Sequence, residues 1–167
     1  MIKKRKLSAG FTLIEMMIYM ALLGFLMIAM TELFAGILDV RSESATTSAV
    51  EQDGRFLLSR FAYDIARASS VSTPASDGSS SSSLVLVIGG VNYTYSIANG
   101  NLQMVNDSGT NMLNSSETTV SNLTFLRVGN TTSSGKTTVQ VTFTVTSRGL
   151  ENGRTQQKIF STTTGLR

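Results

Sequence analysis

Two adjoining stretches of the sequence decide the fold: residues 1–10 read MIKKRKLSAG, and residues 11–31 read FTLIEMMIYMALLGFLMIAMT. The first is short and basic and ends in glycine, and the second is apolar with Glu15 as its single charge. About 20 residues of helix, at about 1.5 Å each, cross a hydrocarbon core of about 30 Å. We therefore expect a single membrane-spanning helix over residues 11–31. The cations Lys3, Lys4, Arg5 and Lys6 predict that the N-terminus stays inside and that the remainder is translocated.

The composition limits the chemistry that the chain can perform. Residues 1–10 hold four cations and no acid, so the formal net charge of +3 becomes −1 without them. A near-neutral remainder lacks the clustered basic surface of a nucleic-acid-binding protein, and we predict no nucleic-acid partner. The chain has no cysteine and no histidine, which removes thiolate chemistry, the commonest zinc ligand and the usual general base. We expect no enzymatic activity, no catalytic residue, no metal and no cofactor.

An amphipathic pattern follows the apolar stretch and predicts that the helix continues over residues 32–72. No proline precedes Pro74, so one helix can run from about residue 11 to about residue 70. Apolar residues recur at helical spacing in its second half, at Leu57, Leu58, Phe61, Ile65 and Ala68. This stripe is expected to pack on a domain as part of its core.

Charged residues in this second half of the helix are spaced for salt bridges. Glu51 lies four residues before Arg55, and Asp64 lies four after Arg60 and three before Arg67. We interpret these carboxylates as ion-pair partners and not as groups for acid–base work. Asp53 has no cation three or four residues ahead of it, and no partner is assigned to it.

The remainder of the chain predicts a β domain. Residues 73–83 are rich in serine and are expected to form a loop. From residue 84 to residue 167 the pattern changes to alternation, with a turn or bulge at Gly89-Gly90 and a hairpin turn at Asn99-Gly100. Short connections favour antiparallel pairing, in a small sheet of four to six strands. The predicted fold class is α+β, with a long N-terminal helix packed on this sheet.

The junction Gly10-Phe11-Thr12-Leu13-Ile14-Glu15, after a basic run, resembles the type III signal of type IV prepilins and pseudopilins. The resemblance implies a pilin fold, cleavage between Gly10 and Phe11 by prepilin peptidase, and methylation of the new Phe11 amine. It also implies that Glu15 pairs with the amine of a neighbouring subunit during assembly. An unpaired carboxylate in an apolar span costs about 2.5–3.5 kcal/mol, which such a cation would offset.

A second resemblance concerns the helix. Residues 51–58, EQDGRFLL, and 64–68, DIARA, are similar to the same region of PilW-type and related minor pilins. Many pilins carry a proline in the apolar helix and a C-terminal cysteine pair, and this chain has neither. The resemblance thus implies a minor pilin or pseudopilin of a type IV pilus, a type II secretion pseudopilus or a DNA-uptake pilus. Implied partners are prepilin peptidase, other pilin or pseudopilin subunits, the inner-membrane assembly platform and, before assembly, membrane lipid.

Other interpretations lead to different expectations. In an ordinary secretory signal the cleavage site follows the apolar region, whereas Gly10 precedes it. Glu15 lies close enough to the helix start to snorkel to the interface without a partner. The alternative function is a membrane-anchored extracellular binding or sensory module that does not polymerise. Five Asn-x-Ser/Thr triplets suggest glycosylation, although chance explains most of them in so polar a region; they begin at Asn92, Asn106, Asn114, Asn122 and Asn130.

Overall fold

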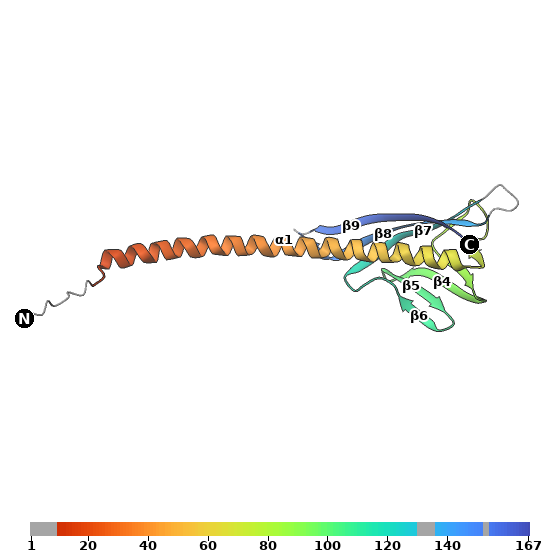
Figure 1. Ribbon diagram of the computed structural model, residues 1–167, viewed down its shortest axis with the longest axis horizontal. Helices are drawn as coiled ribbons and strands as arrows, with labels where there is room; N and C mark the ends of the chain where they lie inside the picture. The colour runs from red at the N-terminus through yellow and green to blue at the C-terminus, as the bar shows by residue number, and fades with distance from the viewer. Residues whose placement is uncertain (1–9, 130–135, 152–153) are drawn as a thin grey trace, which may run out of the picture. The chain divides into compact units, whose positions relative to one another are not determined.

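The computed structural model describes residues 10–129, 136–151 and 154–167, and places in them one helix and nine strands (Figure 1). The helix α1 spans Leu13–Arg67 without a break, but it ends before the predicted bound at residue 72, because Ser70–Thr73 pair as strand β1. The chain separates into two compact units, Met1–Arg41 and Ser42–Arg167, and α1 contributes residues to both. An α+β fold with one long N-terminal helix is confirmed.

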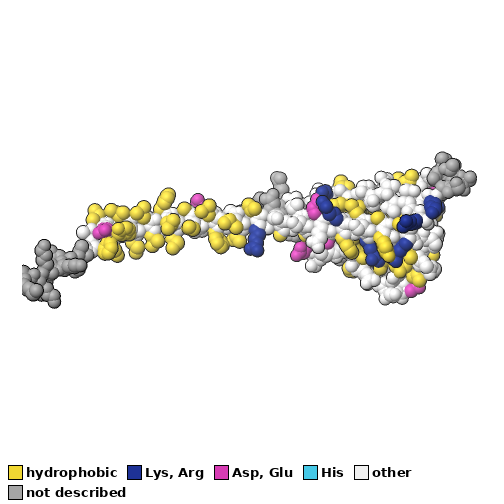
Figure 2. Space-filling model, in the orientation of Figure 1, with side chains coloured by type: hydrophobic (Ala, Val, Ile, Leu, Met, Phe, Trp, Pro, Cys, Tyr) yellow, Lys and Arg dark blue, Asp and Glu magenta, His cyan; other side chains and the backbone are white. Residues whose placement is uncertain are grey.

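In the first unit, the helix is apolar and exposed. Leu13–Leu38 is long and apolar enough to cross a membrane, and none of it is buried within the protein. Figure 2 shows the hydrophobic side chains gathered along this part of α1. The segment extends past the predicted end at residue 31, because Phe34, Ile37 and Leu38 are as exposed as the residues before them. These three residues, expected to belong to an amphipathic half, continue the apolar surface.

The second unit contains two antiparallel sheets, where one sheet of four to six strands was expected. The first sheet has the order β1 (Ser70–Thr73), β3 (Leu84–Ile88), β4 (Val91–Ala98), β5 (Asn101–Asn106) and β6 (Gly109–Met112). The second has the order β2 (Ser80–Ser81), β7 (Thr118–Val128), β8 (Thr138–Glu151) and β9 (Arg154–Gly165). The predicted serine-rich loop therefore carries two strand residues, since Ser80 and Ser81 pair with Leu126 and Phe125 of β7.

Two tight hairpins in the first sheet agree with the sequence signals. Gly89 and Gly90, with φ angles of 59° and 85°, connect the paired residues Ile88 and Val91. Asn99 and Gly100, with φ angles of 52° and 74°, connect β4 to β5. A left-handed backbone at both turn positions matches the twist of antiparallel strands, which explains why these dipeptides end the strands where they do.

The core of the second unit forms around the buried stripe of α1. Leu57, Phe61 and Ile65 are fully buried, as the helical spacing predicted. The ring of Phe61 lies 5.4 Å from that of Tyr95 in the first sheet and 5.5 Å from that of Phe125 in the second. One helical side chain thus packs against both sheets, and burial of this kind is the main stabilising term of a small domain.

Asp64 anchors the helix to the first sheet through a buried ionic network. Its carboxylate is fully buried and accepts from Arg60 Nε at 2.6 Å, from Arg67 Nη2 at 2.8 Å and from the hydroxyl of Tyr95. The predicted salt bridges of Asp64 are confirmed, as is the Glu51–Arg55 pair at 3.3 Å. The Arg67 guanidinium also lies over the ring of Tyr63, 4.8 Å from its centroid. A buried carboxylate is tolerated here because both of its oxygens are bonded to charged or polar donors.

Asp53, for which the sequence suggested no partner, fastens the helix to the segment before β7. Its Oδ2 accepts from the Ser115 backbone N–H at 2.9 Å, from the Ser115 hydroxyl at 2.8 Å and from the Thr118 hydroxyl. The amide of Asn114 in the same segment is buried and donates to Thr118 O at 2.9 Å. The Asn114 side chain is therefore engaged in internal hydrogen bonds, which does not favour glycosylation of the Asn-x-Ser/Thr triplet that begins there. Asn130, which begins another such triplet, lies outside the described residues.

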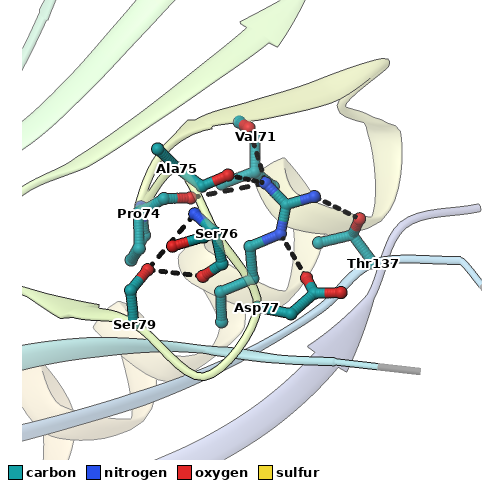
Figure 3. Close-up of polar contacts among 8 residues, drawn as sticks. Val71, Pro74, Ala75, Ser76, Asp77, Ser79 and Thr137 are labelled. Atoms are coloured by element: carbon teal, nitrogen blue, oxygen red, sulfur yellow. Dashed lines mark hydrogen bonds and ion pairs between the residues drawn. The ribbon is translucent and has the colours of Figure 1, made fainter. Parts of the chain in front are cut away.

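Arg127 of β7 bonds to β1 and to the chain that follows it, and Figure 3 labels its partners Val71, Pro74, Ala75 and Asp77. Its Nη1 donates to the carbonyl oxygens of Val71, Pro74 and Ala75, at 3.3, 3.4 and 3.0 Å. Its Nε donates to Asp77 Oδ1 at 2.8 Å. A planar guanidinium can serve these acceptors together, so one side chain of β7 fixes a segment that lacks a ladder of its own.

Candidate functional site

The predicted cleavage junction lies in exposed, non-helical backbone. Gly10 and Phe11 precede the first helical residue, Leu13, and both are exposed. A side chain added at Gly10 would meet no atom within 4 Å among the described residues. A peptidase needs such accessible backbone, because helical peptide groups are engaged in hydrogen bonds. Lys3, Lys4, Arg5 and Lys6 lie outside the described residues.

Thr12 caps the helix directly after this junction. Its Oγ1 accepts from the backbone N–H of Glu15 at 3.3 Å, and its carbonyl accepts the first helical bond, from Met16 N–H, at 3.2 Å. Sequence reasoning gave Thr12 no separate role, although threonine three residues before glutamate is the pattern of a capping box. Because this cap fixes the start of the helix at Leu13, the Gly10–Phe11 junction lies outside the helix.

Glu15 lies in the first turn of α1, surrounded by exposed apolar side chains. Its Oε1 accepts from the Tyr19 hydroxyl at 3.4 Å, one turn further along the helix. Within the described part of the chain, no cation lies within salt-bridge distance of Glu15. A carboxylate near a helix N-terminus is favoured by the helix dipole, but in an apolar environment it still needs a cationic partner. The described residues of the chain do not supply that partner.

Phe11 is turned back along the helix toward Tyr19. The two rings meet edge to face, with centroids 6.2 Å apart and planes at 73°. This arrangement is favourable for aromatic pairs. Glu15 and Tyr19, four residues apart in α1, share one helix face, and the Phe11 ring lies against Tyr19. The sequence predicted roles for Phe11 and Glu15, and the structure adds the contact with Tyr19, which lies four residues after Glu15.

The carboxylates of the second unit engage in structural contacts. The Glu51 carboxylate is paired with Lys158 of β9, and this hydrogen bond is the main reason why the pKa of Glu51 lies below its usual value. Burial, followed by the hydrogen bond to Asp64, raises the pKa of Tyr95 well above the range of a free tyrosine. Tyr95 is therefore a fixed donor at neutral pH, and the Asp64 network holds the helix on the sheet.

Comparison with known proteins assigns one region of the chain. Residues 5–31 match the family model of the prokaryotic N-terminal methylation motif, which covers the end of the basic run at Arg5 and Lys6, the glycine junction and the apolar start of α1. No curated protein and no solved structure gives a significant match. The match therefore includes Gly10, Phe11, Glu15 and Tyr19, and it does not extend to the β domain.

Proposed function

We propose that this type IV pilin-like prepilin, a substrate of prepilin peptidase by its N-terminal motif, is a minor pilin or pseudopilin that assembles through α1. The observation that carries the proposal is the exposed apolar helix Leu13–Leu38 with a carboxylate in its first turn. The motif and this helix also fit a membrane-anchored, single-pass protein. The subtype is supported by the similarity of residues 51–58 and 64–68 to minor pilins and by the lack of cysteine.

The exposed apolar surface gives a physical reason for assembly. Side chains such as Leu13, Phe25 and Phe34 are 80%, 75% and 68% exposed, so lipid or other helices must cover them. Lipid tails are as apolar as these side chains, and therefore the gain on leaving the bilayer comes from close packing and polar pairing. Contacts that join different surfaces of identical or similar subunits extend into an open filament.

Glu15 supplies the polar pairing in this proposal. Cleavage after Gly10 creates an ammonium group on Phe11, which lies at the positive end of the helix dipole. The carboxylate of an adjacent subunit would offset that charge, and the same contact would remove the cost of a lone carboxylate in an apolar environment. Each processed subunit carries both partners, one helical turn apart, so the pairing can repeat from subunit to subunit.

The first experiment determines whether the chain is processed. Intact mass and N-terminal sequencing of the protein from its own membranes should give a chain that starts at Phe11 and carries one added methyl group. A chain that starts at Met1, or one that is cut after the apolar segment, would overturn the pilin mechanism.

The second experiment separates assembly from simple anchoring. Glu15→Ala should leave processing intact and lower the amount of the chain in the filament fraction by about tenfold or more, the expected effect of losing a charged hydrogen-bonded pair. Glu32→Ala is the matched control, because Glu32 is a second acid in the same exposed apolar helix. If Glu15→Ala and wild type reach the filament equally, the chain is better described as a membrane-anchored module that does not polymerise.

A further inference from the structure

We propose that Tyr19 is a positioning residue for assembly, whose hydroxyl holds the Glu15 carboxylate in place for the amine of a neighbouring subunit. This inference rests on the proposed function and adds a residue to it. Between residues 13 and 30, Glu15 and Tyr19 are the only side chains that contain oxygen. They lie four residues apart, on one face of α1, and the Tyr19 hydroxyl donates to Glu15 Oε1 at 3.4 Å.

The contact restrains a side chain that would otherwise be mobile. A glutamate side chain has several rotatable bonds, and fixing it only when a partner arrives costs conformational entropy. Tyrosine has fewer rotatable bonds, and the Tyr19 ring is already held against Phe11. The hydrogen bond therefore places the carboxylate before assembly, which is the general advantage of a preorganised site.

The geometry also divides the two carboxylate oxygens between two tasks. Oε1 accepts from Tyr19, while Oε2 accepts no hydrogen bond from the described residues. The Thr12 hydroxyl accepts from the backbone N–H of Glu15, and within the described residues it makes no hydrogen bond to the carboxylate. Oε2 is thus the oxygen that would accept from an incoming ammonium group. In lipid, where water is absent, the phenol also satisfies part of the carboxylate's bonding capacity.

Packing alone would give Tyr19 a different role, and the two roles predict opposite rankings of two variants. Tyr19→Phe keeps the ring and its contact with Phe11 but removes the donor. Tyr19→Gln removes the ring but keeps an N–H donor four residues from Glu15, a spacing at which such bonds form on helices. If the hydroxyl positions Glu15, the glutamine variant should assemble better than the phenylalanine variant. If the ring merely packs, the phenylalanine variant should assemble better.

The test expresses each full-length variant as the only copy and measures the chain in sheared filaments and in membranes by quantitative immunoblot. Tyr19→Phe should lower the filament fraction about threefold to tenfold, the range expected for one hydrogen bond to a charged acceptor at membrane depth. Tyr19→Gln should retain more than Tyr19→Phe, and both should be processed normally by intact mass. Tyr63→Phe, the loss of a hydroxyl on the exposed face of α1 in the second unit, is the control and should match wild type.

Two results would overturn this role: wild-type assembly of Tyr19→Phe, or a filament fraction for Tyr19→Gln below that of Tyr19→Phe. A failure of the proposed function gives a different pattern. In that case the wild-type chain is itself unprocessed or confined to membranes. That failure is visible in the wild-type sample before any variant is compared.

Discussion

Gly54 allows α1 to approach β9, and its replacement by alanine gives a demanding test of the packing in the second unit. A Cβ built at Gly54 would lie 2.1 Å from Cζ and 2.2 Å from Cε2 of Phe160. Favourable contacts between carbon atoms occur at about 3.5–4.0 Å, so the ring would have to move by well over 1 Å. The ring has little room to move, because it is buried and stacks on Phe143 with centroids 5.7 Å apart.

Two opposing terms set the size of the effect. Overpacking of a core costs about 1–3 kcal/mol, and the short distances at Gly54 place this site near the upper end. Alanine is better than glycine in a helix interior by about 1 kcal/mol. The net loss for Gly54→Ala should therefore be about 2 kcal/mol, which lowers the melting temperature of a unit of this size by about 5–10 °C.

The assay is thermal and urea unfolding of the full-length chain in detergent, followed by the far-ultraviolet circular dichroism of the strands. The same substitution is also made in a Phe160→Ala background, where no ring opposes the new methyl group. There, Gly54→Ala should stabilise the chain by about 1 kcal/mol, which gives a coupling of about 3 kcal/mol between the two positions. Gly36→Ala, on the same helix with no atom within 4 Å of the added Cβ, is the control.

The argument for a close approach would be refuted if Gly54→Ala proved as stable as wild type. It would equally be refuted if the substitution cost as much in the Phe160→Ala background as in wild type. In that case, the loss would come from a local property of the helix and not from contact with β9.

Two further predictions concern groups in the second unit. The folded chain binds the Tyr95 proton more tightly than the unfolded chain, whose tyrosines keep an ordinary pKa of 10.0, so the free energy of unfolding should fall as pH rises above about 10. Urea titrations on either side of that pH should show a smaller fall for Tyr95→Phe than for wild type. An equal fall in the two proteins would contradict the raised pKa of Tyr95. Arg127→Lys should lower the free energy of unfolding by about 1–3 kcal/mol, because an ammonium group cannot bridge the same set of acceptors. It should also speed amide hydrogen exchange in residues 71–79 more than in the buried stripe of α1. An equal change in exchange rate across the whole unit would argue against this role of Arg127.

Local signals in the sequence predicted the features that depend on local structure. The helix, its buried stripe and the salt bridges of Asp64 follow from spacing along α1, and the hairpin at Asn99-Gly100 follows from backbone preference. The cap at Thr12 was equally readable, since both of its residues stand in the quoted motif. For the candidate site, the prediction of Phe11 and Glu15 came from the motif alone, while the proposal for Tyr19 required the observed contact.

Features that depend on distant residues were not predictable in this way. Asp53 bonds to Ser115 and Thr118, more than 60 residues away, so no spacing rule could reveal its partners. The two-sheet arrangement depends on such contacts as well, because strand patterns alone do not state which strands pair. The close approach at Gly54 is a further case, because it involves a ring from β9 that is more than 100 residues away in the sequence. In each case, the missing information was the identity of a neighbour brought close by folding.

The two units respond to different perturbations, and this difference separates folding from assembly. The second unit, Ser42–Arg167, has its own buried core, and Phe61, Asp64 and Phe160 are all buried in it. In the first unit, Leu13–Leu38 has no buried residue, so changes there remove little that stabilises the folded chain. Glu15 and Tyr19 variants should therefore alter assembly while leaving the unfolding transition unchanged. Gly54→Ala should shift that transition while leaving the pairing groups at the start of α1 intact. Finding both effects in one variant would contradict this separation of folding from assembly.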